Sequence, residues 1–156
     1  MARVWIVNAS PCIALERIGH VHLLSALAEV IVPEGVLTEL GRGPRSLGRE
    51  HVRPTRVVRL DLIHPTVAAW DLGLGEAEVL SWAVLPPGAV AIVDDRAARR
   101  WAEVLGVATC GTLGVVLEAK RARLVPAAAP LIHGLRNAGL FLSDSLVERA
   151  LRAVGE

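Results

Sequence analysis

The sequence predicts an α/β fold in which a parallel β-sheet is covered by helices on both faces. Short apolar runs rich in valine and isoleucine, at residues 4–7, 30–32 and 89–93, alternate with longer segments of helical periodicity. Continuous apolar runs of this length are typical of strands that are buried on both sides. Strands that alternate with helices form a parallel sheet through crossover connections. The 156 residues contain no repeat or linker, so we expect one domain over residues 1–156.

Each expected element follows from a local signal: an apolar run for a strand, helical spacing for a helix, and glycine or proline for a break. The expected strands lie at residues 4–7, 29–32, 57–63, 89–93 and 107–110, with the strand at 57–63 at an edge of the sheet. The expected helices lie at residues 11–18, 22–28, 33–40, 75–83, 96–105, 112–121 and 130–137, and a last helix begins at residue 145. The segment 41–59 has no regular period, because glycines, prolines and six arginines interrupt it.

Three of the helices are predicted to begin at hydroxyl side chains. Ser10 suits an N-cap that is followed by Pro11 at the first helical position. Thr112 suits the same role for the helix at 112–121, and Ser145 and Glu148 match a capping box for the last helix.

Composition excludes several classes of protein. The formal charge of +1 excludes a chain that is basic throughout, although a local basic patch is compatible with it. Cys12 and Cys110 lie far apart and form no CxxC pair, which indicates a reducing compartment and argues against a disulfide framework or a cysteine zinc site. The longest charge-free run, 79–93, is broken by prolines and a glycine, so no membrane span is expected. We expect a cytoplasmic protein.

Polar residues at the ends of the strands are the first candidates for a functional site. Asn8 follows the first strand, Asp94 and Asp95 follow a later one, and Glu39 and Glu76 lie on helices. Ligands of open α/β sheets bind at the carboxyl ends of strands. Carboxylates gathered there need a cation or raised pKa values, and hard oxygen ligands suit Mg²⁺ or Mn²⁺. Spacing alone leaves open that both glutamates are surface residues and that Asp95 is a helix N-cap.

The order of four motifs resembles that of a PIN domain. They are Val7-Asn8-Ala9-Ser10-Pro11, Val36-Leu37-Thr38-Glu39-Leu40, Gly75-Glu76-Ala77-Glu78 and Val93-Asp94-Asp95-Arg96. The resemblance covers nearly the whole chain and is greatest to a prokaryotic branch that also has Gly111-Thr112-Leu113-Gly114 followed by an Ala-Lys pair, here Ala119-Lys120. It implies a three-layer α/β/α sandwich with a central parallel sheet of strand order 3-2-1-4-5. It also implies the activity of metal-dependent ribonucleases such as the VapC-like toxins.

The resemblance assigns the site residue by residue. The four acidic positions of the family fall on Asn8, Glu39, Glu76 and Asp95, with Glu78 as the alternative third position and Asp94 as the alternative fourth. It implies Mg²⁺ or Mn²⁺ held by Asn8, Glu39, Glu76, Asp95 and Asp94, of which Glu39, Glu76 and Asp95 are catalytic. Ser10 and Thr112 are candidates for the hydroxyl residue often seen beside the acids. Asn8 departs from the usual aspartate: its amide oxygen can coordinate Mg²⁺ but brings no charge.

Arginines offer contacts to nucleic-acid phosphates. Residues 42–59 contain six arginines and one acidic residue, Glu50. Arginine binds phosphate through two parallel hydrogen bonds, and neutralised phosphates release counterions. We expect RNA contacts from Arg42, Arg45, Arg49, Arg96 and Arg99. A solvated loop or an antitoxin-binding surface is the alternative for the basic segment. Phe141 and four tryptophans offer little support for a stacking platform, because the tryptophans are expected in the core or in a dimer interface.

The leading hypothesis is a cytoplasmic Mg²⁺- or Mn²⁺-dependent ribonuclease that cleaves RNA phosphodiester bonds. The resemblance adds a role as the toxin of a toxin–antitoxin pair, a small antitoxin protein as partner, and a homodimer or higher homo-oligomer. A second hypothesis is a PIN-like module that binds nucleic acid or protein without catalysis, which Asn8 favours. A third, a phosphohydrolase of general α/β type, has no motif in this sequence.

Overall fold

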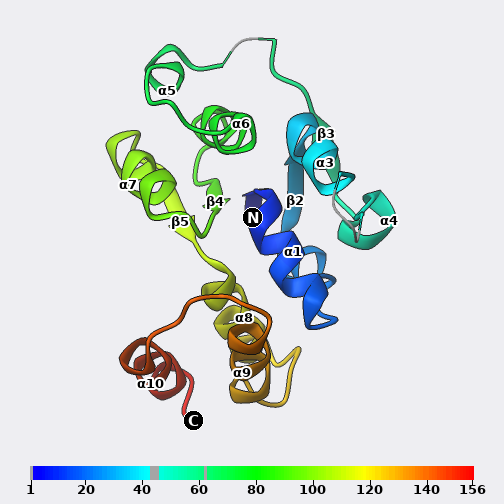
Figure 1. The fold of residues 1–156 in the computed structure, drawn as a ribbon, viewed down its shortest axis with the longest axis vertical. Helices are drawn as coiled ribbons and strands as arrows, with labels where there is room; N and C mark the ends of the chain where they lie inside the picture. The colour runs from blue at the N-terminus through cyan, green and yellow to red at the C-terminus, as the bar shows by residue number, and fades with distance from the viewer. Residues whose placement is uncertain (1, 43–45, 62) are drawn as a thin grey trace.

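A five-stranded parallel sheet forms the centre of the computed structural model, which describes residues 2–42, 46–61 and 63–156. The strands are β1 (Val4–Val7), β2 (Glu29–Pro33), β3 (Arg56–Val58), β4 (Val90–Ile92) and β5 (Ala108–Cys110), in the order β3-β2-β1-β4-β5 (Figure 1). In the middle of the sheet, Trp5 pairs with Val30 on one side and with Val90 on the other. The predicted parallel sheet and its order 3-2-1-4-5 are therefore confirmed.

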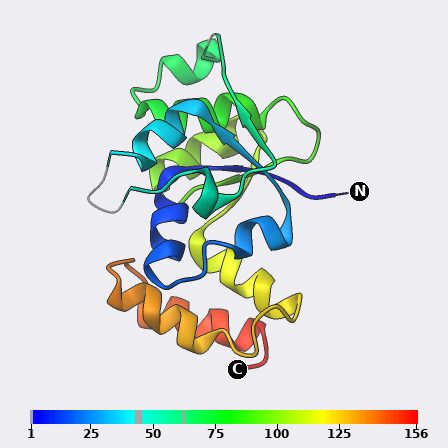
Figure 2. The same ribbon diagram turned by 90° about the vertical axis from the view of Figure 1, so that its right-hand side faces the viewer.

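Helices cover both faces of this sheet. They are α1 (Ala9–Arg17), α2 (Leu23–Leu27), α3 (Glu34–Leu40), α4 (Arg49–Val52), α5 (Pro65–Ala68), α6 (Leu74–Ala83), α7 (Arg96–Val104), α8 (Thr112–Arg121), α9 (Ala129–Asn137) and α10 (Asp144–Ala153). The helices α3, α6 and α7 lie on one side of the sheet, and α1, α2 and α8 lie on the other (Figure 2). The last two helices lie beyond α8, where α9 packs against α1 and α8. No helix within the described ranges is long and apolar enough to cross a membrane.

The central strands are the most deeply buried part of the molecule. Ile6 and Val7 of β1 and Ala91 and Ile92 of β4 are fully buried. Because helices pack on both faces, side chains of both alternations enter the core, which explains why these strands read as unbroken apolar runs. Their burial fixes the carboxyl edge of the sheet, from which the polar residues Asn8, Asp94 and Asp95 emerge.

The predicted N-caps lie one or two residues away from the observed ones. Asn8 is the N-cap of α1, and Ser10 lies inside the helix. Gly111 precedes α8, whose first residue is Thr112, and the Thr112 hydroxyl is used elsewhere. Ser143 caps α10 by accepting the Leu146 N–H at 3.2 Å, so the capping box predicted at Ser145 was wrong. For α1 and α10 a nearby polar residue takes the N-cap position instead, and for α8 the Thr112 hydroxyl bonds to Asp94 while Gly111 occupies that position.

The edge strand also differs from its predicted range of 57–63, since β3 ends at Val58. Its pairing begins earlier, where Thr55 N–H donates to Val30 O at 2.7 Å and the Thr55 hydroxyl accepts the Val30 N–H at 3.1 Å. Val58 pairs with Pro33, the last residue of β2, after which that chain turns into α3. β2 therefore offers no residue for pairing beyond Val58. Short helices α4 and α5, which flank β3, were not predicted.

Candidate active site

Asn8 lies where β1 ends and α1 begins. Its backbone N–H donates to Ile92 O of β4 at 3.1 Å, and its side chain is 2% exposed. The side-chain Nδ2 donates to Glu76 Oε1 at 3.3 Å. The other end of the amide, Oδ1, is buried and has no hydrogen-bond partner among the described groups. A buried acceptor without a partner is rare in folded proteins and needs an explanation, such as an ion or a water molecule.

Glu39, in the last turn of α3, lies close to the Asn8 amide, and both side chains approach Gly75 at the start of α6. Gly75 is buried there, and a Cβ at this position would lie 2.9 Å from Glu39 Oε2 and 3.2 Å from Asn8 Oδ1. The missing side chain of Gly75 therefore leaves room for both oxygens. Partial burial raises the pKa of the Glu39 carboxyl, the negative charge of Glu76 raises it further, and Arg42 opposes both effects. Three oxygen-bearing side chains, from Asn8, Glu39 and Glu76, thus share one small volume.

Glu78 does not join this group. Its Oε2 accepts the Gly35 N–H at 3.0 Å, which places the carboxylate at the start of α3. A negative charge at this end of a helix is favourable. Of the two alternatives for the third acidic position, the structure brings Glu76, and not Glu78, to Asn8.

Asp94 is held by α8. Its Oδ1 accepts the Thr112 N–H at 2.7 Å, and its Oδ2 accepts the Thr112 hydroxyl at 2.6 Å. Thr112 is fully buried, so this contact joins the end of β4 to the start of α8 in the interior. Both carboxylate oxygens of Asp94 are therefore already in hydrogen bonds.

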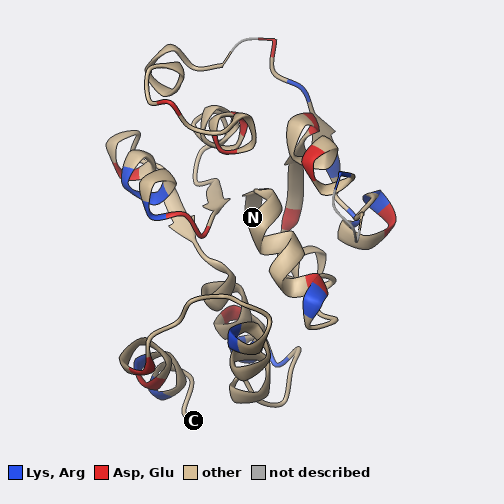
Figure 3. Ribbon diagram, in the orientation of Figure 1, with Lys and Arg blue, Asp and Glu red and all other residues tan. Residues whose placement is uncertain are grey.

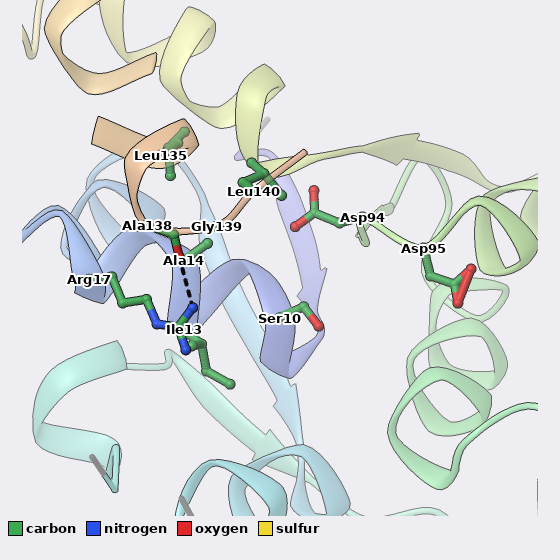
Figure 4. A pocket seen from close by; sticks show the side chains of 10 residues that line it. All are labelled: Ser10, Ile13, Ala14, Arg17, Asp94, Asp95, Leu135, Ala138, Gly139 and Leu140. Atoms are coloured by element: carbon green, nitrogen blue, oxygen red, sulfur yellow. Dashed lines mark hydrogen bonds between the residues drawn. The ribbon is translucent and has the colours of Figure 1, made fainter. Parts of the chain in front are cut away.

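Asp95 is exposed and caps α7, where its Oδ1 accepts the Ala97 N–H at 2.7 Å. The helix-cap interpretation of Asp95 is thereby confirmed, and it does not exclude a second role for the carboxylate. The Asp94 and Asp95 side chains point in different directions (Figure 4). Within residues 2–42, 46–61 and 63–156, no group of three or more His, Cys, Asp or Glu side chains is close enough to hold a metal ion.

The donor set around Asn8 nevertheless fits a hard divalent cation. The amide oxygen of Asn8 and the carboxylates of Glu39 and Glu76 are all oxygen donors, which Mg²⁺ and Mn²⁺ prefer. The negative charge of Glu76 raises the pKa of Glu39, and a bound cation would offset the repulsion between the two carboxylates. Sequence reasoning missed Gly75, although its place directly before Glu76 in the Gly-Glu-Ala-Glu motif is the signal that could have found it.

A groove lies beside this site, next to Asp94 and Asp95 (Figure 4). Its volume is about 490 Å³, and its walls come from α1, the turn between β4 and α7, and the segment after α9. Arg17 of α1 crosses one side and donates from Nη1 to Ala138 O at 3.0 Å. Of the two hydroxyl candidates, Ser10 lines this groove, whereas Thr112 is buried against Asp94.

The predicted phosphate-binding arginines lie on two parts of the surface. Arg96 and Arg99 are exposed on α7, directly after the acidic turn (Figure 3), and Arg99 Nε also donates to Val93 O at 3.1 Å. Arg42 is exposed after α3, close enough to Glu39 to influence its pKa, and Arg49 is exposed on α4. Arg45 lies outside the described residues.

The sheet order and the oxygen-bearing side chains at its carboxyl edge define an α/β protein with a parallel sheet and a candidate cation site. A family described as a PIN domain matches the chain over residues 4–156. The protein therefore belongs to the PIN-domain family, whose members are generally nucleases. No curated protein matches the chain.

Proposed function

We propose that the protein is a metal-dependent ribonuclease whose cation is held by Asn8, Glu39 and Glu76, with Asp95 close to the reaction. The observation that supports this most is the buried Asn8 Oδ1, which lacks a partner beside two carboxylates. Membership of the PIN-domain family supports a nucleic-acid substrate and a divalent cofactor. RNA, rather than another nucleic acid, and Mg²⁺ or Mn²⁺ are the finer parts of the proposal.

The side chains have separate tasks in this proposal. A bound cation polarises the phosphodiester and lowers the pKa of water. Glu76 orients the Asn8 amide through the hydrogen bond to Nδ2, so that Oδ1 faces the ligand position. Glu39 holds the cation beside Asn8 Oδ1, where a bound cation would offset the burial and the Glu76 charge that raise the pKa of the Glu39 carboxyl. Arg96 and Arg99 hold phosphates on one side of the site, and Arg42 and Arg49 hold them on the other. Arg45, which lies outside the described residues, belongs to the same basic segment of the sequence and is proposed to add a further phosphate contact.

The proposal also includes a cytoplasmic toxin that works with a small antitoxin protein and assembles as a homodimer or higher homo-oligomer. This part rests on the resemblance to VapC-like toxins.

A module that binds without cleaving is a second candidate, and a specific observation favours it. Asn8 brings no charge to the ligand set, and both oxygens of Asp94 are occupied by Thr112. Fewer free carboxylates mean a weaker cation site, and this candidate predicts RNA or protein binding without metal-dependent cleavage.

Cleavage of labelled single-stranded RNA with Mn²⁺, with Mg²⁺ and with EDTA tests the proposal. We expect cleavage only with a cation, and we expect Glu76→Gln and Asp95→Asn each to abolish it while the circular dichroism spectrum stays unchanged. Glu103→Gln, an exposed change on α7, is the matched control and should cleave normally. Full activity of both site variants would contradict the assignment, and wild-type protein that binds RNA without cleaving it would favour the second candidate.

A further inference from the structure

Apart from Asp95, the side chains that line the groove have no role in the proposed hydrolysis, and they suit a nucleotide. Its volume of about 490 Å³ lies within the range of small-molecule sites. One wall is apolar and presents Ile13, Ala14 and Leu140 in front of the fully buried Leu135, while Ser10 and Arg17 supply polar groups. We propose that this groove binds one unpaired nucleotide of RNA next to the bond that is cut. The proposal rests on the ribonuclease function proposed above.

Arg17 is the group that would hold a phosphate. Its guanidinium is exposed, and one of its five N–H donors is used by Ala138 O at 3.0 Å. This bond ties α1 to the end of α9 across the groove, so the charged group is held in place rather than free to rotate in solvent (Figure 4). No acidic side chain of the described residues forms an ion pair with Arg17. The remaining donors are therefore available for a phosphate oxygen.

The apolar wall suits the face of a base. Leu140, which is partly exposed, is fixed to α9 because its N–H donates to the O atom of the fully buried Leu135 at 3.0 Å. The turn between them requires Gly139, whose φ of +105° is strained for other residues. Phe141 follows Leu140 and is 87% exposed, so an aromatic ring stands free in the same segment. Bases stack on such rings with little regard to sequence.

Charge sets the orientation of the nucleotide. Asp94 and Asp95 line the end of the groove that is nearest the sheet, and their charges repel a phosphate there. Arg17 therefore receives the phosphate, and the base lies against Ile13 and Leu140. A hollow of this size admits one base, and the bases of a duplex are paired and stacked, so the ligand is unpaired RNA. Ser10 and Asn8 stand in the first turn and at the N-cap of α1, which places the groove beside the oxygen cluster.

Binding in EDTA tests the groove separately from catalysis. Fluorescence anisotropy with a short labelled single-stranded RNA compares the wild type with Arg17→Gln, Leu140→Ala and the groove-filling Ala14→Leu. Glutamine at position 17 keeps a donor for Ala138 O but removes the positive charge. A loss of RNA affinity in this variant therefore reports the lost phosphate contact and not a lost hydrogen bond between α1 and the end of α9. Arg149→Gln on α10 and Leu124→Ala after α8 are exposed control substitutions of the same residue types. We expect each groove variant to weaken binding at least about tenfold, and the controls to leave it unchanged.

Photo-crosslinking locates the RNA directly. With thiouridine-substituted RNA, we expect crosslinked peptides from residues 10–17 and 135–142. Crosslinks confined to other segments, unchanged affinity of all three groove variants, or no RNA binding by the wild type would overturn the groove proposal. Cleavage assays run in parallel distinguish the two proposals. If the wild type cleaves RNA and the groove variants bind RNA with wild-type affinity, the groove proposal is rejected and the ribonuclease proposal stands. Groove-dependent binding without any cleavage supports the groove and rejects the ribonuclease.

Discussion

At the scale of single residues, the two ends of the Asn8 amide are in different situations. Nδ2 donates to Glu76, while Oδ1 is buried without a partner among the described groups. An aspartate at this position could donate to Glu76 only if it carried a proton. An ionised aspartate would place two carboxylates at this distance, and they would repel each other. Asparagine therefore suits a site that stays folded without a cation and retains one neutral oxygen for it.

Replacement of Asn8 by aspartate should shift this balance. We expect Asn8→Asp to bind Mn²⁺ about tenfold more tightly, since a charged ligand replaces a neutral one, and to melt at a lower temperature than the wild type in EDTA. Isothermal titration calorimetry measures the affinity and differential scanning calorimetry the melting temperature. The matched substitution Asn137→Asp, at the exposed end of α9, should leave the affinity unchanged. Equal Mn²⁺ affinity of Asn8→Asp and wild type would show that Asn8 is not a ligand.

Glu39 makes stability depend on pH. Its carboxyl binds a proton more tightly in the folded chain than in the unfolded one, because burial and Glu76 raise its pKa. The free energy of unfolding therefore falls as the pH rises from the ordinary pKa of glutamate through the raised one. In EDTA, Glu39→Gln should lose this part of the decrease, which urea unfolding at acidic and neutral pH measures. The expectation would be contradicted if the free energy of unfolding of Glu39→Gln depended on pH in the same way as that of the wild type and of the control Glu103→Gln.

At the scale of elements, contacts between distant segments decide where helices begin and what their first residues do. The hydroxyl of Thr112 looks like a helix cap in the sequence, but Asp94, at the end of β4, accepts both its N–H and its O–H. The first residue of α8 is thus hydrogen-bonded to the segment after β4, and its hydroxyl does not cap its own helix. The choice between Ser143 and Ser145 for α10, or between Asn8 and Ser10 for α1, is equally invisible in local sequence, because all four side chains are good caps.

The contact between Asp94 and Thr112 should contribute measurably to stability. Thr112→Val keeps the shape and the backbone N–H but removes the hydroxyl donor from Asp94 Oδ2. We expect the free energy of unfolding to fall by about 1–3 kcal/mol, the usual cost of a lost buried hydrogen bond to a charged group. Urea denaturation gives the value, with Thr109→Val on β5 as the matched control. A loss no larger than that of the control would mean that the contact adds nothing.

At the scale of the whole molecule, the sequence was informative where burial is strong. The central strands were predicted because helices on both faces leave only apolar residues in them, and the edge strand β3 was misplaced because its pairing depends on where β2 ends. The strand order came from the resemblance to PIN domains, since periodicity does not say which strands are neighbours. Asn8, Glu39 and Glu76 could be named as candidates from the sequence motifs. The space left by Gly75 and the hydrogen bonds of Asp94 to Thr112 could be seen only in the folded chain.

The two halves of the site come from different stretches of the chain. The oxygen cluster draws on residues 8, 39, 75 and 76, whereas the far wall of the groove comes from residues 135–140. Substitutions in the later stretch can therefore reshape the groove without moving the oxygens. If the proposed ribonuclease and its nucleotide groove are correct, a change of three or four residues at and after the end of α9 should alter which nucleotide the groove prefers and leave the chemistry unchanged, so redesign would begin in this stretch.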